Sequence, residues 1–169
     1  MQLLRKIERK KWIGLEHEWV PAGEFCADPL GDLGTAGGTL SVWRVDADAG
    51  CDEARIAAAI GALRNFGNVD YWLIDEQALL DGGFAVEACE APSADPDLSK
   101  KSHRDIIKLT ERSLLNLASL FREKGKPGTC TSAEIMQRLS AGIGMGTIAR
   151  ERVKDSWKKR MEQVGLLPP

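Results

Sequence analysis

The sequence predicts an α+β protein, with a small N-terminal α/β sheet unit and a C-terminal helical region. Two short runs rich in β-branched and aromatic residues, LSVWRV at 40–45 and VDYWLID at 69–75, have the composition of strands. Residues 52–66 lie between these runs and carry apolar side chains at helical spacing. Beyond residue 101 the apolar residues follow a helical period, which predicts that this part of the chain is helical.

The first eleven residues, MQLLRKIERKK, contain five basic residues and one Glu. They fit a short helix with Leu3, Leu4 and Ile7 on one side. They fit equally an arm that lies on phosphate groups, and packing of this segment against the body is the commoner outcome.

The helix expected over 52–66 begins with Asp52 and Glu53, which suit the positive end of a helix, and Gly67 suits its exit. If the strands on either side of it pair in parallel, this helix is a right-handed crossover. Residues 84–91, FAVEACEA, predict a third strand.

The charge divides the chain into two expected domains, at residues 1–97 and 98–169. The first contains 8 basic and 18 acidic residues, a net charge of −10, and the second contains 15 basic and 7 acidic residues, a net charge of +8. Residues 91–101 contain two prolines and small polar side chains, which predicts a linker or a surface loop. Either the basic part faces nucleic acid, or the two parts attract and cover each other.

Residues 102–124 predict one long helix. Ser102 with Asp105 three residues later resembles a capping box, and Gly125 and Pro127 are expected to stop the helix. The apolar stripe of this segment is broad, so we expect burial on more than one side.

The C-terminal segment predicts a helical pair. Thr131 and Glu134 form a capping box of the T-x-x-E type at the start of the first helix. Glycines at 142, 144 and 146 are expected to break it. Thr147 then caps a second helix that runs to about Val164.

This segment resembles the DNA-binding part of helix-turn-helix and winged-helix proteins. The residues that carry the resemblance are Ser132-Ala133-Glu134-Ile135, Leu139, the glycine-containing turn from Gly142 to Gly146, and Thr147-Ile148. The resemblance implies that the helix from Thr147 reads bases in the major groove.

The contacts that this resemblance implies are of two kinds. Polar and basic side chains near the start of the second helix would meet base edges, and basic side chains around them would meet phosphates. The predicted DNA-contacting residues are Arg138, Thr147, Arg150, Lys154, Lys158, Lys159 and Arg160. The alternative is an amphipathic terminal helix that packs Trp157 into the body and leaves a solvated basic face.

The cysteines and histidines suggest neither a metal site nor catalysis. The four cysteines are widely spaced without a Cys-x-x-Cys pair, so each is interpreted as a small core thiol. His17 points away from Glu16 and Glu18 in an extended segment, and His103 is expected at a helix start. We therefore expect no enzyme, no metal and no cofactor.

The leading hypothesis is a DNA-binding or DNA-associated regulatory protein in the cytoplasm, with duplex DNA as partner and a homodimer that meets two half-sites. The alternative is a non-enzymatic protein-interaction module, an accessory or immunity-like subunit of a larger complex, with Trp19 and Trp43 as candidate anchors of the acidic part. No secretory signal is expected in MQLLRKIERKKW, and no apolar run reaches the length of a membrane span.

Overall fold

The structure, a computed structural model, describes residues 1–14, 18–22 and 24–168. Its strands all belong to one sheet. They are β1 (Gln2–Ile7), β2 (Leu40–Val45), β3 (Val69–Asp75), β4 (Ala85–Ala88), β5 (His103–Ile107) and β6 (Lys126–Cys130). The two strands predicted at 40–45 and 69–75 are confirmed at those bounds, and the third predicted strand is the shorter β4.

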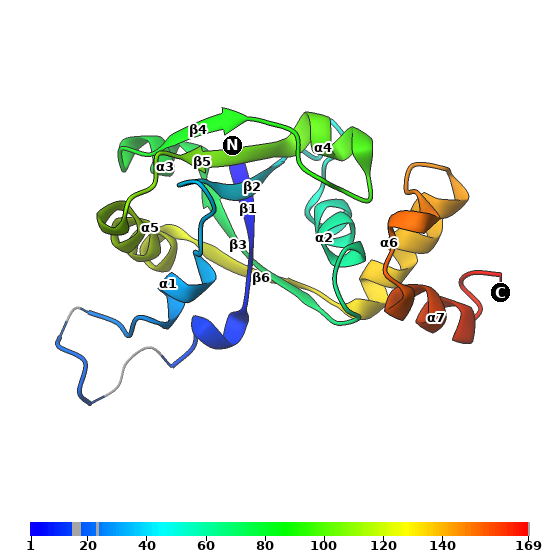
Figure 1. The fold of residues 1–169 in the computed structure, drawn as a ribbon, viewed down its shortest axis with the longest axis horizontal. Coiled ribbons are helices and arrows are strands. Elements are labelled where there is room, and N and C mark those ends of the chain that lie inside the picture. Colours follow the sequence, from blue (N-terminus) through cyan, green and yellow to red (C-terminus); the bar gives the residue numbers. More distant parts are fainter. Residues whose placement is uncertain (15–17, 23, 169) are drawn as a thin grey trace.

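The sheet is antiparallel throughout, with the strand order β4-β5-β2-β1-β3-β6 (Figure 1). β1 lies between β2 and β3 and pairs with both. The strands on either side of the predicted crossover helix therefore do not pair with each other. They run in the same direction, because each is antiparallel to β1.

Helices cover both faces of this sheet, and the α+β class is confirmed. The helices are α1 (Asp28–Asp32), α2 (Glu53–Ala62), α3 (Glu76–Asp81), α4 (Pro96–Ser102), α5 (Glu111–Lys124), α6 (Ser132–Gly144), α7 (Asp155–Gln163) and the 3-10 helices η1 (Arg9–Lys11) and η2 (Arg150–Arg152). Side chains of α2, α4, α6 and α7 share a core with one face, and those of α3 and α5 share a core with the other. Among the described residues, no helix combines the length and apolarity needed to cross a membrane.

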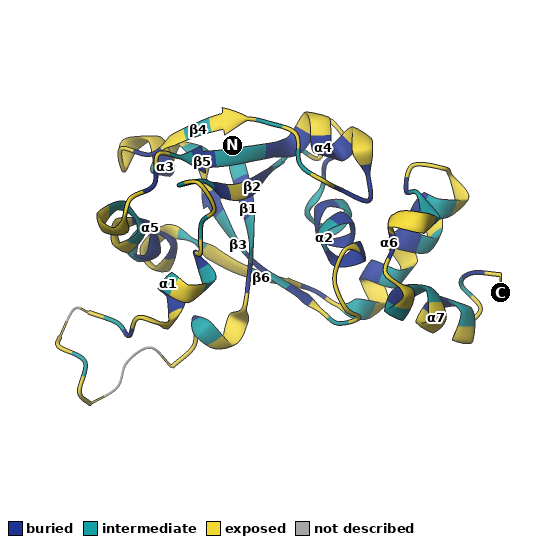
Figure 2. Cartoon of the chain, viewed as in Figure 1, coloured by how far each residue is buried: buried dark blue, intermediate teal, exposed yellow. Residues whose placement is uncertain are grey.

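The burial pattern marks these two cores (Figure 2). On one face Ile56, Leu139 and Trp157 are fully buried in one core together with side chains of the sheet. On the other face Leu117 and Phe121 of α5 are fully buried. A core on each side makes a three-layer arrangement, with the sheet as the middle layer.

The N-terminal segment is a strand in the middle of the sheet, so residues 2–7 form neither a helix nor a free arm, and the third expectation, packing against the body, is confirmed. Leu3 and Leu4 are both 0% exposed because adjacent side chains of a strand point to opposite faces, and both faces are covered here. A strand buried on both faces has no alternating pattern, and its basic residues suggested a solvated segment instead.

The single helix expected over 102–124 is wrong in its first third. His103–Ile107 form β5 between β2 and β4, and the chain turns at Lys108, whose φ is 58°. The capping box is built by Thr110 and Ser113 at the start of α5, not by Ser102 and Asp105. α5 ends at Lys124 as expected, and Pro127 then lies in the edge strand β6, where a missing N–H is tolerated.

Both parts of the chain contribute strands to the same sheet. β5 and β6 come from residues after 97 and pair with β2, β4 and β3. Residues 91–101, expected to form a linker or surface loop, include most of α4, whose Leu98 is fully buried. The expected boundary at residue 97 falls within this helix.

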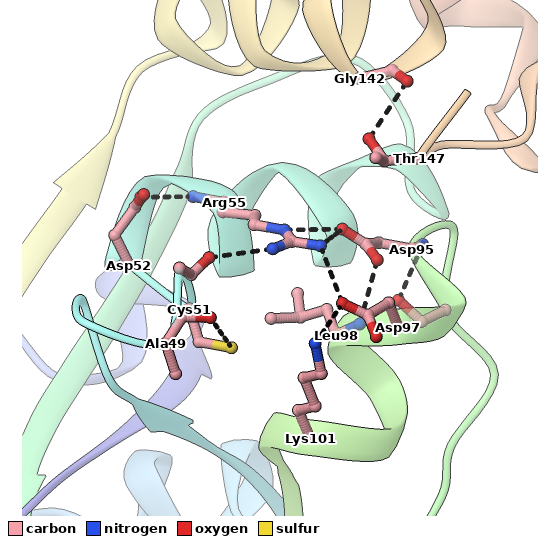
Figure 3. A network of polar contacts seen from close by, with 12 residues as sticks. Ala49, Cys51, Asp52, Arg55, Asp95, Asp97, Leu98, Lys101, Gly142 and Thr147 are labelled. Carbon is pink, nitrogen blue, oxygen red and sulfur yellow. Dashed lines mark hydrogen bonds and ion pairs between the residues drawn. The ribbon is translucent and has the colours of Figure 1, made fainter. Parts of the chain in front are cut away.

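An ion pair holds α4 against α2 (Figure 3). Arg55 of α2 donates from Nε and Nη2 to Oδ2 of Asp95, at 2.8 and 2.7 Å. Asp95 is 1% exposed, and its other oxygen accepts the backbone N–H of Leu98 at 3.0 Å. One carboxylate therefore caps α4 and joins it to α2.

The predicted capping box of Thr131 and Glu134 is confirmed at the start of α6. The continuous helix expected from Thr147 to about Val164 is wrong, because the segment forms η2, an extended residue Val153, and then α7. The backbone N–H of Lys154 donates to the carbonyl oxygen of Ala62 at 2.8 Å. That N–H is taken by α2, so it is not available to an uninterrupted helix.

Candidate functional site

Carboxylates of the same chain pair three of the seven residues predicted to contact DNA. The pairs are Arg138 with Asp52 at 3.5 Å, Arg150 with Glu162 at 2.9 Å and Lys158 with Asp155 at 2.7 Å. Arg150 also donates to the carbonyl oxygen of Pro168 at 3.2 Å. These cations have partners inside the chain that a phosphate would have to compete with.

The other four predicted residues are placed differently from one another. Thr147 donates its hydroxyl to the carbonyl oxygen of Gly142 at 3.2 Å, so it closes the turn after α6 (Figure 3). Lys159 and Arg160 are exposed on α7. Lys154 donates to the side chain of Asn65 at 3.3 Å and lines a hollow of about 760 Å³.

This hollow, called the cationic pocket below, collects residues that are far apart in the sequence. Its walls come from β1, β2, β5, the C-terminal end of α2, the end of α1 and residues 91–93. Its basic side chains are Arg5, Lys6, Arg64 and Lys154, and its acidic side chains are Glu8 and Asp32. The pocket thus gathers more positive than negative charge.

Two cations of the pocket, Lys6 and Arg64, have no side-chain partner in the part of the chain that the structure describes. Neither takes part in a side-chain hydrogen bond or ion pair with the residues that the structure describes. Burial lowers the pKa of Lys6, and the nearby charges of Arg64 and Arg5 lower it further, against the opposing effect of Asp32 and Glu8. The charged form of Lys6 is therefore less stable here than in water.

Arg5 is held in place by the backbone. Its Nη1 donates to the carbonyl oxygen of Ser41 and its Nη2 to that of Asp32, both at 3.0 Å. Its Nε is buried without a hydrogen-bond partner among the described residues. Burial lowers the pKa of Arg5, Asp32 opposes this, and Arg64 adds to it. The two carbonyl contacts leave the positive charge unneutralised.

The acidic side chains of the pocket already have partners elsewhere. One oxygen of Asp32 accepts the N–H of Glu8 at 3.0 Å and the indole N–H of Trp12 at 2.7 Å. Glu8 pairs with Lys11 at 3.4 Å, and its hydrogen bond to that lysine lowers the pKa of Glu8. Both carboxylates thus hold η1 in place, and neither is in an ion pair with Lys6 or Arg64.

The sequence did not single out Arg5, Lys6 or Arg64 as site residues, although Arg5 and Lys6 lie in the segment considered as an arm on phosphate groups. Lys6 was part of a basic segment interpreted as a helix or arm, and Arg64 lies just beyond the end of α2. Their proximity depends on β1 entering the middle of the sheet, which no local pattern signals. Trp43, considered as an interface anchor, is 7% exposed and lines the pocket, whereas Trp19 is 73% exposed.

The cysteines and histidines are placed less uniformly than expected. Cys26, Cys51 and Cys130 are buried and all four thiols are free, as expected for core thiols. Cys89 is half-buried and lies beside His103, which is in a strand and not at a helix start. Glu16 and His17 lie outside the described residues.

No protein-family model matches this chain, and the searches of curated proteins and of solved structures found no similar protein. The geometry and charge of the cationic pocket are therefore the basis for a functional proposal.

Proposed function

We propose that the protein binds a phosphate-bearing ligand in the cationic pocket. The observation that carries the proposal is that Lys6 and Arg64 line one pocket while neither has a counter-ion among the described residues. Placing like charges together without a partner costs free energy in the folded protein. A bound anion would remove that cost, since it favours the charged form of every nearby cation.

The pocket supplies the donors that phosphate recognition uses. Arg64 offers a planar guanidinium that can give two parallel hydrogen bonds to one phosphate, and Lys6 offers a compact point charge. Arg5 is fixed by the carbonyl oxygens of Ser41 and Asp32, so its charge is already in place before a ligand arrives. A pre-organised cation loses little side-chain entropy on binding.

The size of the pocket suits a ligand of nucleotide dimensions. Its volume of about 760 Å³ lies in the range of small-molecule sites. A second hollow of about 430 Å³ shares Asn65 and Lys154 with it and continues along the start of α7 to Lys158. A ligand with successive phosphates could therefore occupy both hollows.

A free nucleotide and a nucleic-acid strand present the same phosphate chemistry to these residues. In the second case Lys154 and Lys158, both predicted to contact DNA, would meet the phosphates that follow the one in the pocket. Such contacts fix position without reading sequence. The predicted role of the protein in binding duplex DNA is one form of this proposal.

Fluorescence anisotropy with labelled single-stranded and duplex oligonucleotides tests the proposal, with a nucleotide and inorganic phosphate as competitors. Because charge-assisted hydrogen bonds contribute about 1.5–3 kcal/mol, Arg64→Ala should weaken binding by about tenfold or more. The matched control is Lys124→Ala, which removes the same charge from an exposed site on α5.

The competitors distinguish the ligand sources. Displacement by a nucleotide at low concentration indicates a small-molecule site, while binding of the oligonucleotide alone indicates nucleic acid. The proposal fails if neither oligonucleotide nor nucleotide binds at about 50 mM salt, where phosphate binding is favoured. An equal decrease of ligand affinity in Arg64→Ala and Lys124→Ala would also contradict the proposal.

A further inference from the structure

We propose that Cys89, His103 and Asp105 form a binding site for a zinc ion. The three residues offer a sulfur, an imidazole nitrogen and a carboxylate oxygen, all within 4.8 Å of one another. This combination of ligands is one that Zn²⁺ accepts, since it binds thiolate, imidazole and carboxylate. The proposal is independent of the phosphate ligand.

The sheet places the three side chains together. His103 and Asp105 are two residues apart on β5, so they project from the same face. Cys89 follows β4, and its N–H donates to the carbonyl oxygen of His103 at 3.4 Å, which continues the ladder between β4 and β5. Ligands that come from two paired strands are held by the backbone and need little ordering when an ion binds.

The distances fit a single ion. Cys89 Sγ lies 3.1 Å from His103 Nδ1, and Asp105 Oδ1 lies 3.9 Å from the other ring nitrogen, Nε2. Only one of the two nitrogens can bind the ion, and one ligand atom from each of the three residues lies within 4.8 Å of the other two. Zinc bonds of about 2.0–2.3 Å place ligand atoms about 3–4 Å apart, so rotations of the side chains are enough to close the site. The strands themselves need not move.

Two polar atoms of the cluster lack partners. His103 is 2% exposed, and neither its Nε2 nor Asp105 Oδ1 has a hydrogen-bond partner among the described residues. A buried polar atom without a partner is costly and calls for an explanation such as an ion. The rings of Trp43 and His103 pack in a T-shaped arrangement, with centroids 4.7 Å apart, which holds the imidazole in position.

The site is open on one side. Cys89 is half-buried, and the side chain of Asp105 is 24% exposed, so an ion can enter from solvent. Three protein ligands leave a fourth position of a tetrahedral zinc for water. His103 also lines the cationic pocket, so an ion here would lie at the margin of that pocket.

Titration of the chelator-treated full chain with Zn²⁺, followed by competition with a chromophoric chelator, tests the site. We expect one ion per chain. With Co²⁺ in place of Zn²⁺, we expect a thiolate-to-cobalt charge-transfer band in the near ultraviolet. Cys89→Ser should abolish that band and weaken metal binding by about 100-fold or more, since even loss of an outer contact costs about 10–100-fold.

The matched controls are Glu87→Gln and Cys130→Ala. Glu87 lies directly opposite Asp105 in the strand register and is exposed, so its loss removes the same charge as Asp105→Asn without removing a proposed ligand. Equal losses in Glu87→Gln and Asp105→Asn would overturn the proposal, because general attraction to acidic groups would then explain binding. Cys130 is a buried thiol elsewhere, and Cys130→Ala should keep the cobalt band.

Two further results would overturn the site. If Cys89→Ser binds zinc as tightly as the parent chain, the ion is held elsewhere. If micromolar zinc does not bind, the contact between Cys89 and His103 is only a thiol–imidazole hydrogen bond. Metal titrations are run without phosphate, and phosphate binding is measured with a chelator present, so each proposal can fail alone.

Discussion

The indole N–H of Trp157 donates to the carbonyl oxygen of Gly61 at 2.9 Å, across 96 positions of the sequence. The same N–H also reaches the carbonyl oxygen of Arg64, at 3.0 Å. Gly61 lies in the last turn of α2 and Arg64 just beyond its end, where carbonyl groups have no i+4 donor within the helix. Trp157 thus fixes α7 against α2 and positions the backbone that carries Arg64 and Lys154 at the cationic pocket.

Trp157→Phe should lower the free energy of unfolding by about 2 kcal/mol, because it removes the indole hydrogen bonds to Gly61 and Arg64 and leaves part of the indole site empty. Trp72→Phe is the matched control. Trp72 Nε1 is buried without a hydrogen-bond partner among the described residues, so that variant loses no hydrogen bond. Urea unfolding of both variants measures the two changes in the free energy of unfolding. A larger decrease in Trp72→Phe than in Trp157→Phe would contradict the prediction.

The packing of Trp157 into the body was foreseeable from the sequence, whereas the interruption before α7 was not. The alternative interpretation of the C-terminal segment already placed this apolar side chain inward. The helix expected from Thr147 is interrupted at Val153, because the N–H of Lys154 donates to a distant group, the carbonyl oxygen of Ala62. Such a tertiary contact cannot be predicted from the local pattern of apolar residues.

Elements that depend on the local sequence could be predicted, and elements that depend on tertiary contacts could not. α2 and β3 follow from local periodicity and β-branched composition. β5 was interpreted as helix because Ile106 and Ile107 continue the apolar period of α5. The pairing of Cys89 with His103 depends on the register of β4 with β5, which residue spacing alone does not specify.

Asp95→Ala should destabilise the protein by about 3 kcal/mol, because it removes the buried carboxylate that makes the two short contacts with the partly buried Arg55 guanidinium. It also removes the cap of α4. Asp97→Asn is the matched control, since Asp97 is exposed and lies farther from Arg55, at 3.7 Å. In thermal and urea unfolding, Asp95→Ala should be much less stable than both Asp97→Asn and the parent chain. If Asp97→Asn is the less stable variant, Asp97 is the main partner of Arg55.

Lys6→Met should raise stability at neutral pH and weaken binding of the phosphate-bearing ligand. The lowered pKa of Lys6 means that its charge opposes folding below that pKa. As the pH rises through the folded-state pKa toward the ordinary value of about 10.4, this opposition disappears. The stability difference between Lys6→Met and the parent chain should therefore be larger at pH 7 than near pH 10.

Unfolding by urea at both pH values measures that difference, and titrations common to both proteins cancel in it. A Lys6→Met chain that is less stable at pH 7 would show that the ammonium group has a stabilising partner. If Lys6→Met is more stable but binds the ligand with unchanged affinity, Lys6 does not contribute to ligand binding.

Arg64→Ala should also reduce the salt dependence of oligonucleotide binding. Each phosphate contact releases counterions and contributes about 0.9 to the slope of log affinity against log salt for duplex DNA. Loss of one contact should reduce the slope by about that amount, and Lys124→Ala should leave it unchanged. Lys159→Ala, which removes an exposed charge of α7 outside the pocket, shows whether the helix itself contacts phosphates.

Gly142→Ala should destabilise the protein, whereas Gly144→Ala should leave its stability unchanged or raise it, although both glycines lie in α6. Alanine in a helix is favoured over glycine by about 1 kcal/mol. A Cβ at position 144 would meet nothing within 4 Å, so Gly144→Ala should be neutral or stabilising. A Cβ at position 142 would lie 2.7 Å from Ile148 Cδ1 and 2.8 Å from its Cγ1, closer than side-chain atoms pack.

Gly142→Ala should therefore cost about 1–3 kcal/mol, as overpacking of a core does. Ile148 is 5% exposed and has little room to withdraw, because its own N–H also donates to the carbonyl oxygen of Gly142 at 3.1 Å. Thermal unfolding of the two variants side by side decides the point. A stabilised Gly142→Ala chain would mean that Ile148 repacks, and that the turn joining α6 to η2 is not fixed by close contact with this glycine.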